Sequence, residues 1–255
     1  MNYKEAFQRN IGVFTPDEQE KIKSLKVAIA GCGGMGGQAS MQLVRTGVET
    51  FNIADFDVYN YVNINNQFNC NVDTIGKNKS EVVREDILKI NPDAIVNSFK
   101  KGVKKENVDE FLEGVDIVVD AIDYYNQKDS LILHKKAKEK GLYVFAPQAI
   151  GVGASLLVFD PSGVDIEQYL GNDSIESNLI PAEKFSAYIP TYADPTVVEA
   201  VVQNSGEYLP NIASAQTLGI SMLVSEVLLL VLKGKKPVCV PKYFHIDLWD
   251  KKIIT

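Results

Sequence analysis

Short apolar runs alternate with segments of helical periodicity along the first 160 residues of the chain. Each run is rich in Val, Ile, Ala or Phe and has the length of a buried strand. The runs occupy residues 26–30, 50–54, 94–99, 115–123 and 142–146. The helical segments lie at residues 38–45, 80–90, 105–113 and 126–140. This β-α alternation predicts a doubly wound α/β fold, with a mainly parallel sheet and helices on both faces.

The two ends of the chain depart from this alternation. Residues 1–25 read as a helical lead-in, in which Thr15-Pro16-Asp17-Glu18 combines a capping threonine, a proline at the first helical position and a glutamate three residues after the cap. The later part contains a strand, a long irregular stretch, an apolar helix and a closing strand, expected at residues 155–159, 160–209, 212–232 and 243–247. Long irregular stretches in compact chains are usually functional. We therefore expect one domain over 1–255, with a nucleotide-binding half at 1–160 and a variable half at 161–255 that extends the sheet with antiparallel strands.

A glycine cluster follows the first strand. Gly31, Gly33 and Gly36 fit the G-x-G-x-x-G pattern, in which the glycines make a tight turn, let backbone N–H groups approach a phosphate and let the helix pack close to the strand. The N-terminus of the helix then offers unpaired N–H groups and a favourable dipole to an anion. The motif predicts a Rossmann-like nucleotide site. By itself it leaves open whether the nucleotide is a redox cofactor or a consumed substrate.

Polar side chains stand where predicted strands end or helices begin. Asp55 follows the second strand, where such folds hold the ribose hydroxyls; the alternative is a turn-forming aspartate. Lys79 lies in the first turn of a helix, where the dipole disfavours a cation, so we expect an anion nearby unless this lysine is simply exposed. Asp120 and Asp123 end the fourth strand and are candidate magnesium or nucleotide contacts.

Composition excludes several other classes of protein. A net charge of −7 argues against general nucleic-acid binding. Cys32, Cys70 and Cys239 form no C-x-x-C pair, and with two histidines in the chain we expect no zinc site and a reducing, cytoplasmic location. The N-terminus lacks a signal-peptide core, and the apolar stretch 218–232 is interrupted by Glu226 and falls short of the roughly 18 apolar residues of a membrane span. We expect a soluble protein.

Several short motifs occur together, in one order, over residues 1–160. They are Arg9-Asn10, Gly31-Cys-Gly33-Gly34-Met-Gly36, Asp55-Phe-Asp57, Asn63-Ile-Asn65-Asn66-Gln67, Gly76-Lys77-Asn78-Lys79, Ile90-Asn91-Pro92 and Asp120-Ala-Ile-Asp123. In order and spacing this set resembles the ThiF/MoeB/HesA family, relatives of the ubiquitin-activating enzymes. The resemblance implies ATP rather than a nicotinamide cofactor. It also implies a reaction in which a substrate carboxylate attacks the α-phosphorus, giving an acyl-adenylate and pyrophosphate.

The resemblance also implies roles for individual residues. Asp55 would hold the ribose, Lys79 would contact phosphate oxygens and Asp123 would bind Mg²⁺. Arg9 would reach the ATP of a partner across a homodimer interface, so Lys79, Asp123 and Arg9 are the expected catalytic residues. The expected nucleotide contacts are Gly31, Gly33, Gly34, Gly36, Asp55, Asp57, Asn63, Asn66, Gln67 and Lys79. The acceptor would be the C-terminus of a ubiquitin-like or sulfur-carrier-like protein, a peptide or a small acid.

The chain departs from the family pattern near the phosphates. Asn66 stands where the family has an arginine, and an amide cannot supply the forked cation that stabilises a departing pyrophosphate. Lys77 and Arg84 are candidates to replace that charge. Tyr124 follows Asp123, where the family has an asparagine.

Three hypotheses follow from these motifs. The leading one is an ATP-dependent adenylyltransferase without a thioester step, because the chain has no cysteine between Cys70 and Cys239, where several family members carry one. The second is a catalytically degenerate relative that binds ATP or a partner, motivated by Asn66. The third is an NAD-dependent oxidoreductase, which would have no use for Lys79 or Asp123.

Overall fold

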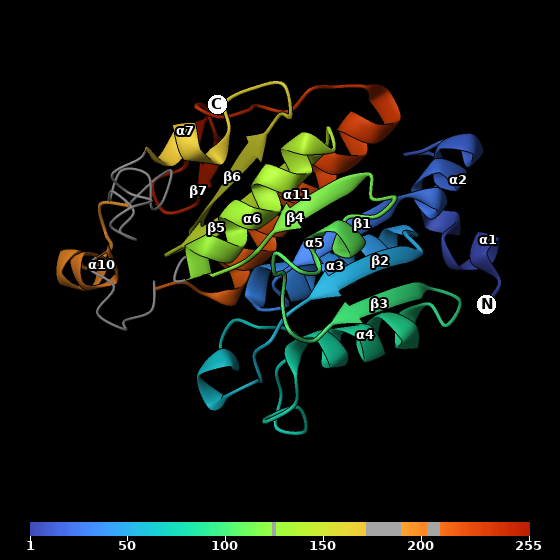
Figure 1. Cartoon of the computed structure of the whole chain (residues 1–255), viewed down its shortest axis with the longest axis horizontal. Helices are drawn as coiled ribbons and strands as arrows, with labels where there is room; N and C mark the ends of the chain where they lie inside the picture. The colour runs from blue at the N-terminus through green and yellow to red at the C-terminus, as the bar shows by residue number, and fades with distance from the viewer. Residues whose placement is uncertain (124–125, 172–189, 203–209) are drawn as a thin grey trace.

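An eight-stranded sheet forms the centre of the computed structural model (Figure 1), which describes residues 1–123, 126–171, 190–202 and 210–255. In chain order the strands are β1 (Lys26–Ala30), β2 (Thr50–Ala54), β3 (Ile95–Phe99), β4 (Ile117–Asp120), β5 (Tyr143–Ile150), β6 (Gly153–Phe159), β7 (Phe244–Asp247) and β8 (Lys252–Ile254). Their order across the sheet is β3-β2-β1-β4-β5-β6-β7-β8. Strands β1 to β5 pair in parallel, whereas β6, β7 and β8 are antiparallel additions. The predicted fold class is confirmed.

Helices cover both faces of this sheet. They are α1 (Tyr3–Ala6), α2 (Pro16–Ser24), α3 (Gly34–Thr46), α4 (Lys79–Ile90), α5 (Val108–Phe111), α6 (Gln127–Glu139), α7 (Ile166–Leu170), α10 (Pro195–Val202) and α11 (Ala213–Lys233), with short 3₁₀ turns η1 (Gln8–Asn10) and η2 (Tyr61–Asn63). Figure 1 shows α6 in front of the sheet and α11 behind it.

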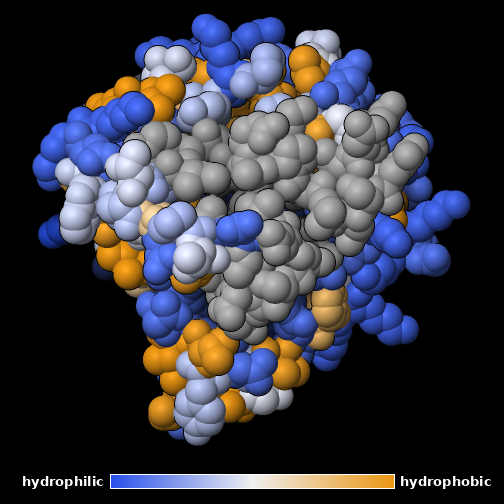
Figure 2. Space-filling view, turned by 90° about the vertical axis from the view of Figure 1, so that its left-hand side faces the viewer, coloured by the Kyte–Doolittle hydropathy of each residue, from blue (hydrophilic) through white to orange (hydrophobic). Residues whose placement is uncertain are grey.

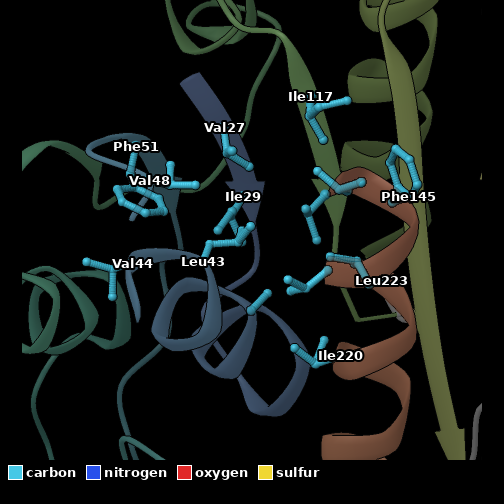
Figure 3. Packing of buried hydrophobic residues seen from close by; sticks show 14 of the residues in the cluster. Val27, Ile29, Leu43, Val44, Val48, Phe51, Ile117, Phe145, Ile220 and Leu223 are labelled. Carbon is cyan, nitrogen blue, oxygen red and sulfur yellow. The ribbon is translucent and has the colours of Figure 1, made fainter. Parts of the chain in front are cut away.

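The alternation of side chains along β1 divides the core into two layers. Val27 and Ile29 point to the face covered by α3 and α11, where they meet Leu43 and Leu223 (Figure 3). The alternate residues of β1, Ala28 and Ala30, face α5 and α6. Because alanine side chains are small, the face under α5 and α6 has room near the carboxyl ends of the strands.

Several elements differ in length from the predictions. Helix α3 begins at Gly34 rather than at residue 38, since a run of glycines gives no helical signal even where its backbone is helical. The helix expected at 105–113 is only the short α5. The predicted strands at 142–146 and 155–159 lengthen into a hairpin that turns at Gly151, which has a φ of +58°. Strand β8 was not predicted. Within the expected irregular stretch the structure describes α7 and α10, while residues 172–189 and 203–209 lie outside the described residues.

The apolar helix expected at 212–232 is α11. By length and composition alone it would be able to cross a membrane, but more than half of that apolar window is buried within the fold. Its buried residues include Ile220, Leu223 and Val227, which join the core on the α3 face of the sheet. The helix therefore reads as a core element.

Asp160, at the end of β6, gives one prediction about stability. Its carboxylate accepts hydrogen bonds from the hydroxyls of Tyr143 (2.7 Å) and Ser162 (2.6 Å). Burial raises its pKa, but the bonds from Ser162 and Tyr143 outweigh burial and hold the pKa at about 2. Since this lies below the ordinary value of about 3.9, ionised Asp160 stabilises the fold above pH 4, and the contribution is lost as the pH falls through about 2. Asp160→Asn should lower the free energy of unfolding by roughly 1–2 kcal/mol at pH 7 and by less at pH 3 in urea titrations. An equal loss at both pH values would contradict this.

Candidate nucleotide-binding site

A cavity of about 840 Å³ opens where the carboxyl ends of β1, β2 and β4 meet the N-terminus of α3. Such crevices bind ligands in open α/β sheets, because β1 has neighbours on both sides and the connecting loops diverge there. The structure brings most of the expected site residues to this cavity, namely Gly31, Gly33, Gly34, Asp55, Asp57, Asn63, Asn66, Gln67, Lys79, Asp120 and Asp123. Gly36 and Arg9 are not among the described residues that line it.

The glycine turn shapes the phosphate end of the cavity. Gly31 has a φ of +91°, and a Cβ there would collide with the carbonyl of Ala121. A Cβ on Gly36 would collide with the carbonyl oxygen of Gly31, so Gly36 lets α3 pack closely against the turn and does not line the cavity. Gly33 caps α3 without a side-chain hydrogen bond. The first N–H groups of α3, from Gly34 onward, are therefore left for an anion.

Asp55 is fixed by backbone hydrogen bonds. Its Oδ2 accepts from the N–H of Cys32 at 2.6 Å and its Oδ1 from the N–H of Asp57 at 2.8 Å. Burial raises the pKa of Asp55, and the bonds from the two N–H groups and the charge of Lys79 act in the opposite direction. Each carboxylate oxygen has a second lone pair. Asp55 is therefore held ready to accept the two hydroxyls of a ribose.

Lys79 is buried in the wall of the cavity, 8% exposed. Its position follows from Asn78, whose side chain caps α4 and donates to the carbonyls of Asp55 (3.1 Å) and Asp57 (3.2 Å), tying α4 to the end of β2. The Nζ of Lys79 lies 3.4 Å from a carboxylate oxygen of Asp57. Asp57 is half exposed, so this ion pair is weak, and a phosphate can compete for the ammonium group. The alternative of an exposed, flexible lysine is wrong.

The two aspartates after β4 differ in their surroundings. The carboxylate of Asp120 is hydrogen-bonded by His134 Nε2 at 2.9 Å, by the Ser130 hydroxyl and by the N–H of Ile122 at 3.1 Å. With these donors in place, Asp120 is poorly suited to bind a cation. Asp123 lies at the exposed rim of the same cavity, and the neighbouring Tyr124 lies outside the described residues.

Asp123 is the better magnesium candidate of the two. In the described part of the chain, no three His, Cys, Asp or Glu side chains are grouped to hold a metal ion. Magnesium, however, is usually bound by one or two carboxylates together with the phosphates of a substrate and water. A single rim carboxylate such as Asp123 fits that requirement.

Asn66 belongs to a cluster of amide side chains above the glycine turn. Its Nδ2 donates to the Asn211 side chain at 2.8 Å. In the orientation that satisfies both ends of its amide, Gln216 of α11 donates to the carbonyls of Asn66 (2.6 Å) and Gly34 (3.2 Å). Asn211 and Gln216 were not predicted, because no local pattern links them to a motif some 145 residues earlier.

The cavity is acidic. Lys79 is the one lysine or arginine among the described residues that line it, whereas its carboxylates are Asp55, Asp57, Asp120, Asp123 and Asp129. Lys77 is exposed outside the lining, and Arg84 donates to the carbonyl of Val96. Neither side chain therefore brings a positive charge into the cavity. A nucleotide polyphosphate needs cations beyond Lys79.

Comparison with known proteins agrees with the geometry. The family model described as ThiF matches residues 7–254. The chain belongs to the ThiF family. It is 35% identical over 136 residues to a tRNA threonylcarbamoyladenosine dehydratase of Haemophilus influenzae, covering 53% of this chain and 52% of that protein. It is 31% identical over 110 residues to a probable molybdopterin-synthase adenylyltransferase of Gracilaria tenuistipitata, covering 43% of this chain and 31% of that protein. This chain thus spans about half of the length of these curated relatives or less.

Solved structures share the ThiF-type fold over nearly the whole chain. E. coli MccB, in a complex with AMPCPP and selenomethionine MccA, superposes with a TM-score of 0.75 and 20% identity, covering 99% of this chain and 71% of that one. PaaA superposes with a TM-score of 0.70 and 22% identity, covering 98% of this chain and 72% of that one. The likeness includes the antiparallel strands that extend the sheet.

Proposed function

We propose that this ThiF protein is an ATP-dependent adenylyltransferase. A substrate carboxylate attacks the α-phosphorus of ATP, an acyl-adenylate forms and pyrophosphate leaves. The observation that carries the proposal is the convergence of the glycine turn, Asp55 and Lys79 on one cavity. The names of its relatives support it, since one is a probable adenylyltransferase and a structural neighbour was crystallised with an ATP analogue. The acceptor is the carboxylate of a small carrier-like protein, a peptide or a small acid.

Each group in the cavity then has a role. Asp55 accepts the ribose hydroxyls, and the first N–H groups of α3 bind phosphate oxygens. Asn63, Asn66 and Gln67 line the phosphate end, where one amide oxygen of Gln67 is buried without a partner. Lys79 neutralises charge on the leaving pyrophosphate. Mg²⁺ held by Asp123 and the nucleotide phosphates would add further neutralisation.

No cysteine is suited to a thioester step. Burial raises the pKa of the thiols of Cys32, Cys70 and Cys239, whereas a nucleophilic cysteine needs a lowered pKa. We therefore propose that the acyl-adenylate passes directly to its acceptor. All three thiols are free, which fits a cytoplasmic enzyme.

The missing positive charge points to a second copy of the chain. Arg9 is exposed in η1, and its neighbour Asn10 donates to the carbonyl of Thr46 at 2.8 Å. Thr46 ends α3, whose 13 residues span about 20 Å at 1.5 Å per residue. Arg9 thus lies about that far from the phosphate end of its own cavity. We propose that Arg9 of one copy serves the cavity of the other in a homodimer.

Exposed apolar residues stand where such a dimer would need them. The segment between β2 and α4 carries Val58, Tyr61, Val62, Ile64 and Phe68, each more than 40% exposed. It forms the lobe at the bottom of Figure 2, where orange surface is prominent. Ile11 and Val13, beside Arg9, are also exposed. Clustered exposed apolar residues are typical of interaction sites, and a two-fold dimer would bury both regions.

The degenerate alternative is tested at Asn66. If the enzyme is active, Asn66→Arg should lower carboxylate-dependent ATP–pyrophosphate exchange about tenfold, because the longer side chain displaces the contacts with Asn211 and Gln216 that steady the turn at Gly34. The control is Asn71→Arg, which adds the same charge at an exposed position outside the cavity lining. A gain of activity in Asn66→Arg over an inactive wild type would support the degenerate alternative instead.

Ligand-induced thermal stabilisation tests the choice of nucleotide. The protein is heated with Mg·ATP or with NAD, each well above the concentration that saturates it. A ligand at 100 times its Kd stabilises a protein by about 2.7 kcal/mol. We expect stabilisation by Mg·ATP and none by NAD. The reverse result would favour the oxidoreductase and contradict the proposal.

A further inference from the structure

The cavity continues beyond the nucleotide site into an apolar pocket between the sheet, α6 and α7, which we name the side chamber. Its walls come from β5, β6 and α7, and they are Ala146, Leu157, Phe159, Ile166, Tyr169 and Leu170. The side chains of Leu157, Phe159 and Leu170 are 4%, 6% and 7% exposed. The side chamber is therefore part of one continuous cavity, but its walls are apolar, whereas the nucleotide site is lined by aspartates.

Aromatic contacts keep the wall of the side chamber in place. The ring of Phe159 lies edge to face with His134 of α6, at 4.5 Å between centroids, and with Tyr169 of α7, at 5.8 Å. Such contacts fix ring orientation as well as adding apolar burial. The side chamber is thus bounded by positioned side chains on three elements.

A bound nucleotide would not occupy the side chamber, so the side chamber is open to the second substrate. Asp55, at the end of β2, sets the position of the ribose, which directs the base toward the apolar residues on the β2–β3 side, Phe56 and Val103. The side chamber lies on the other side of β1, beside β5 and β6. A carboxylate that attacks the α-phosphorus from that side would carry the rest of its substrate into or past the side chamber.

The electrostatics of the side chamber favour an apolar occupant. Asp120 stands between the side chamber and the glycine turn, and its oxygens already accept hydrogen bonds from His134, Ser130 and the N–H of Ile122. These donors occupy most of the lone pairs of the carboxylate, so Asp120 has little capacity left to accept a hydrogen bond from a polar group of a substrate. A second carboxylate or a phosphate on the substrate would be repelled by the aspartates that line the nucleotide site. Burial of an apolar substrate group against the apolar side chains of the remaining walls stabilises the bound complex.

We propose that the side chamber binds an apolar group next to the reacting carboxylate, so that the substrates are acids such as peptides ending in leucine or phenylalanine rather than in a glycine tail. This inference rests on the proposed adenylyltransferase function. Shape-selective apolar pockets typically discriminate between substrates by about 10- to 200-fold. We expect kcat/KM for a peptide that ends in leucine or phenylalanine to be at least tenfold higher than for the same peptide ending in glycine.

The test compares peptides that differ only in the last residue. ATP–pyrophosphate exchange is measured with the wild-type protein, Mg·ATP and tetrapeptides Ala-Ala-Ala-X, where X is glycine, leucine or phenylalanine. Equal or faster exchange with the glycine peptide would overturn the inference while leaving the proposed function intact. Binding of Mg·ATP without exchange from any apolar peptide would also overturn it. A protein that binds no ATP would instead contradict the proposed function.

Two variants at one position locate the preference in the side chamber. Ala146→Leu fills the side chamber, and Ala146→Gly enlarges it. We expect Ala146→Leu to lower kcat/KM for the leucine peptide about tenfold, and Ala146→Gly to shift the preference toward phenylalanine, with Kd for Mg·ATP within twofold of wild type in both. Thermal unfolding checks that each variant is folded. If Ala146→Leu weakens ATP binding as strongly as it slows exchange, the base occupies the side chamber and the inference is wrong.

Discussion

Replacing Lys79 with methionine is expected to lower carboxylate-dependent ATP–pyrophosphate exchange by about 100-fold or more. Loss of one preorganised group that stabilises developing charge typically costs a factor of 10² to 10³ in rate, and Lys79 is the one cationic side chain among the described residues lining the cavity. Methionine keeps most of the apolar stem. The fold should tolerate the change, because the carboxylate left behind on Asp57 is half exposed.

The matched control is Lys77→Met, two residues away. Lys77 is exposed and does not line the cavity, so this variant should keep wild-type exchange. Loss of exchange in both variants would indicate a general effect of charge. Full activity of Lys79→Met would remove Lys79 from the mechanism.

Mixing two inactive variants should restore activity if Arg9 acts across a dimer. Arg9→Ala and Lys79→Met are each expected to be nearly inactive, because every site in either homodimer lacks one cation. After the subunits exchange, half of the dimers are mixed, and each mixed dimer has one complete site. In a two-fold dimer this gives about a quarter of wild-type exchange.

Two results would contradict the shared site. The first is no recovery after mixing, with native mass spectrometry showing that mixed dimers have formed. The second is an Arg9→Ala variant that keeps full activity. A protein that remains monomeric at working concentration would leave Arg9 about 20 Å from its own phosphate site and would contradict the dimer directly.

The fold and the nucleotide end of the candidate site were predictable because their signals are local. A buried parallel strand has a recognisable pattern, a short apolar run such as residues 26–30. A turn that requires a positive φ favours a glycine such as Gly31. Asp55 and Lys79 were found because the ends of β2 and the start of α4 have fixed places in this topology. The structure added the reason for their geometry, namely the bridge that Asn78 makes between them.

The remaining features depend on contacts between distant segments. Gln216 reaches Asn66 and Gly34 only because α11 packs beside α3. Asp120 is satisfied by His134 and Ser130, which lie on the next helix, and the sequence alone ranks it with Asp123 as a metal ligand. The side chamber likewise arises from small and apolar side chains on β5, β6 and α7, none of which belongs to a motif.

The central claim, that this site consumes ATP to activate a carboxylate, is tested most directly by isotope exchange. The wild-type protein is incubated with Mg·ATP, labelled pyrophosphate and tetrapeptides that end in glycine, leucine or phenylalanine, each supplied with a free C-terminal carboxylate or as the C-terminal amide. We predict that label enters ATP with the free carboxylates, requires Mg²⁺ and does not appear with the amides, because formation of an acyl-adenylate is reversible and needs the carboxylate oxygen. No label in ATP with any free acid, or equal label with the amides, would contradict it.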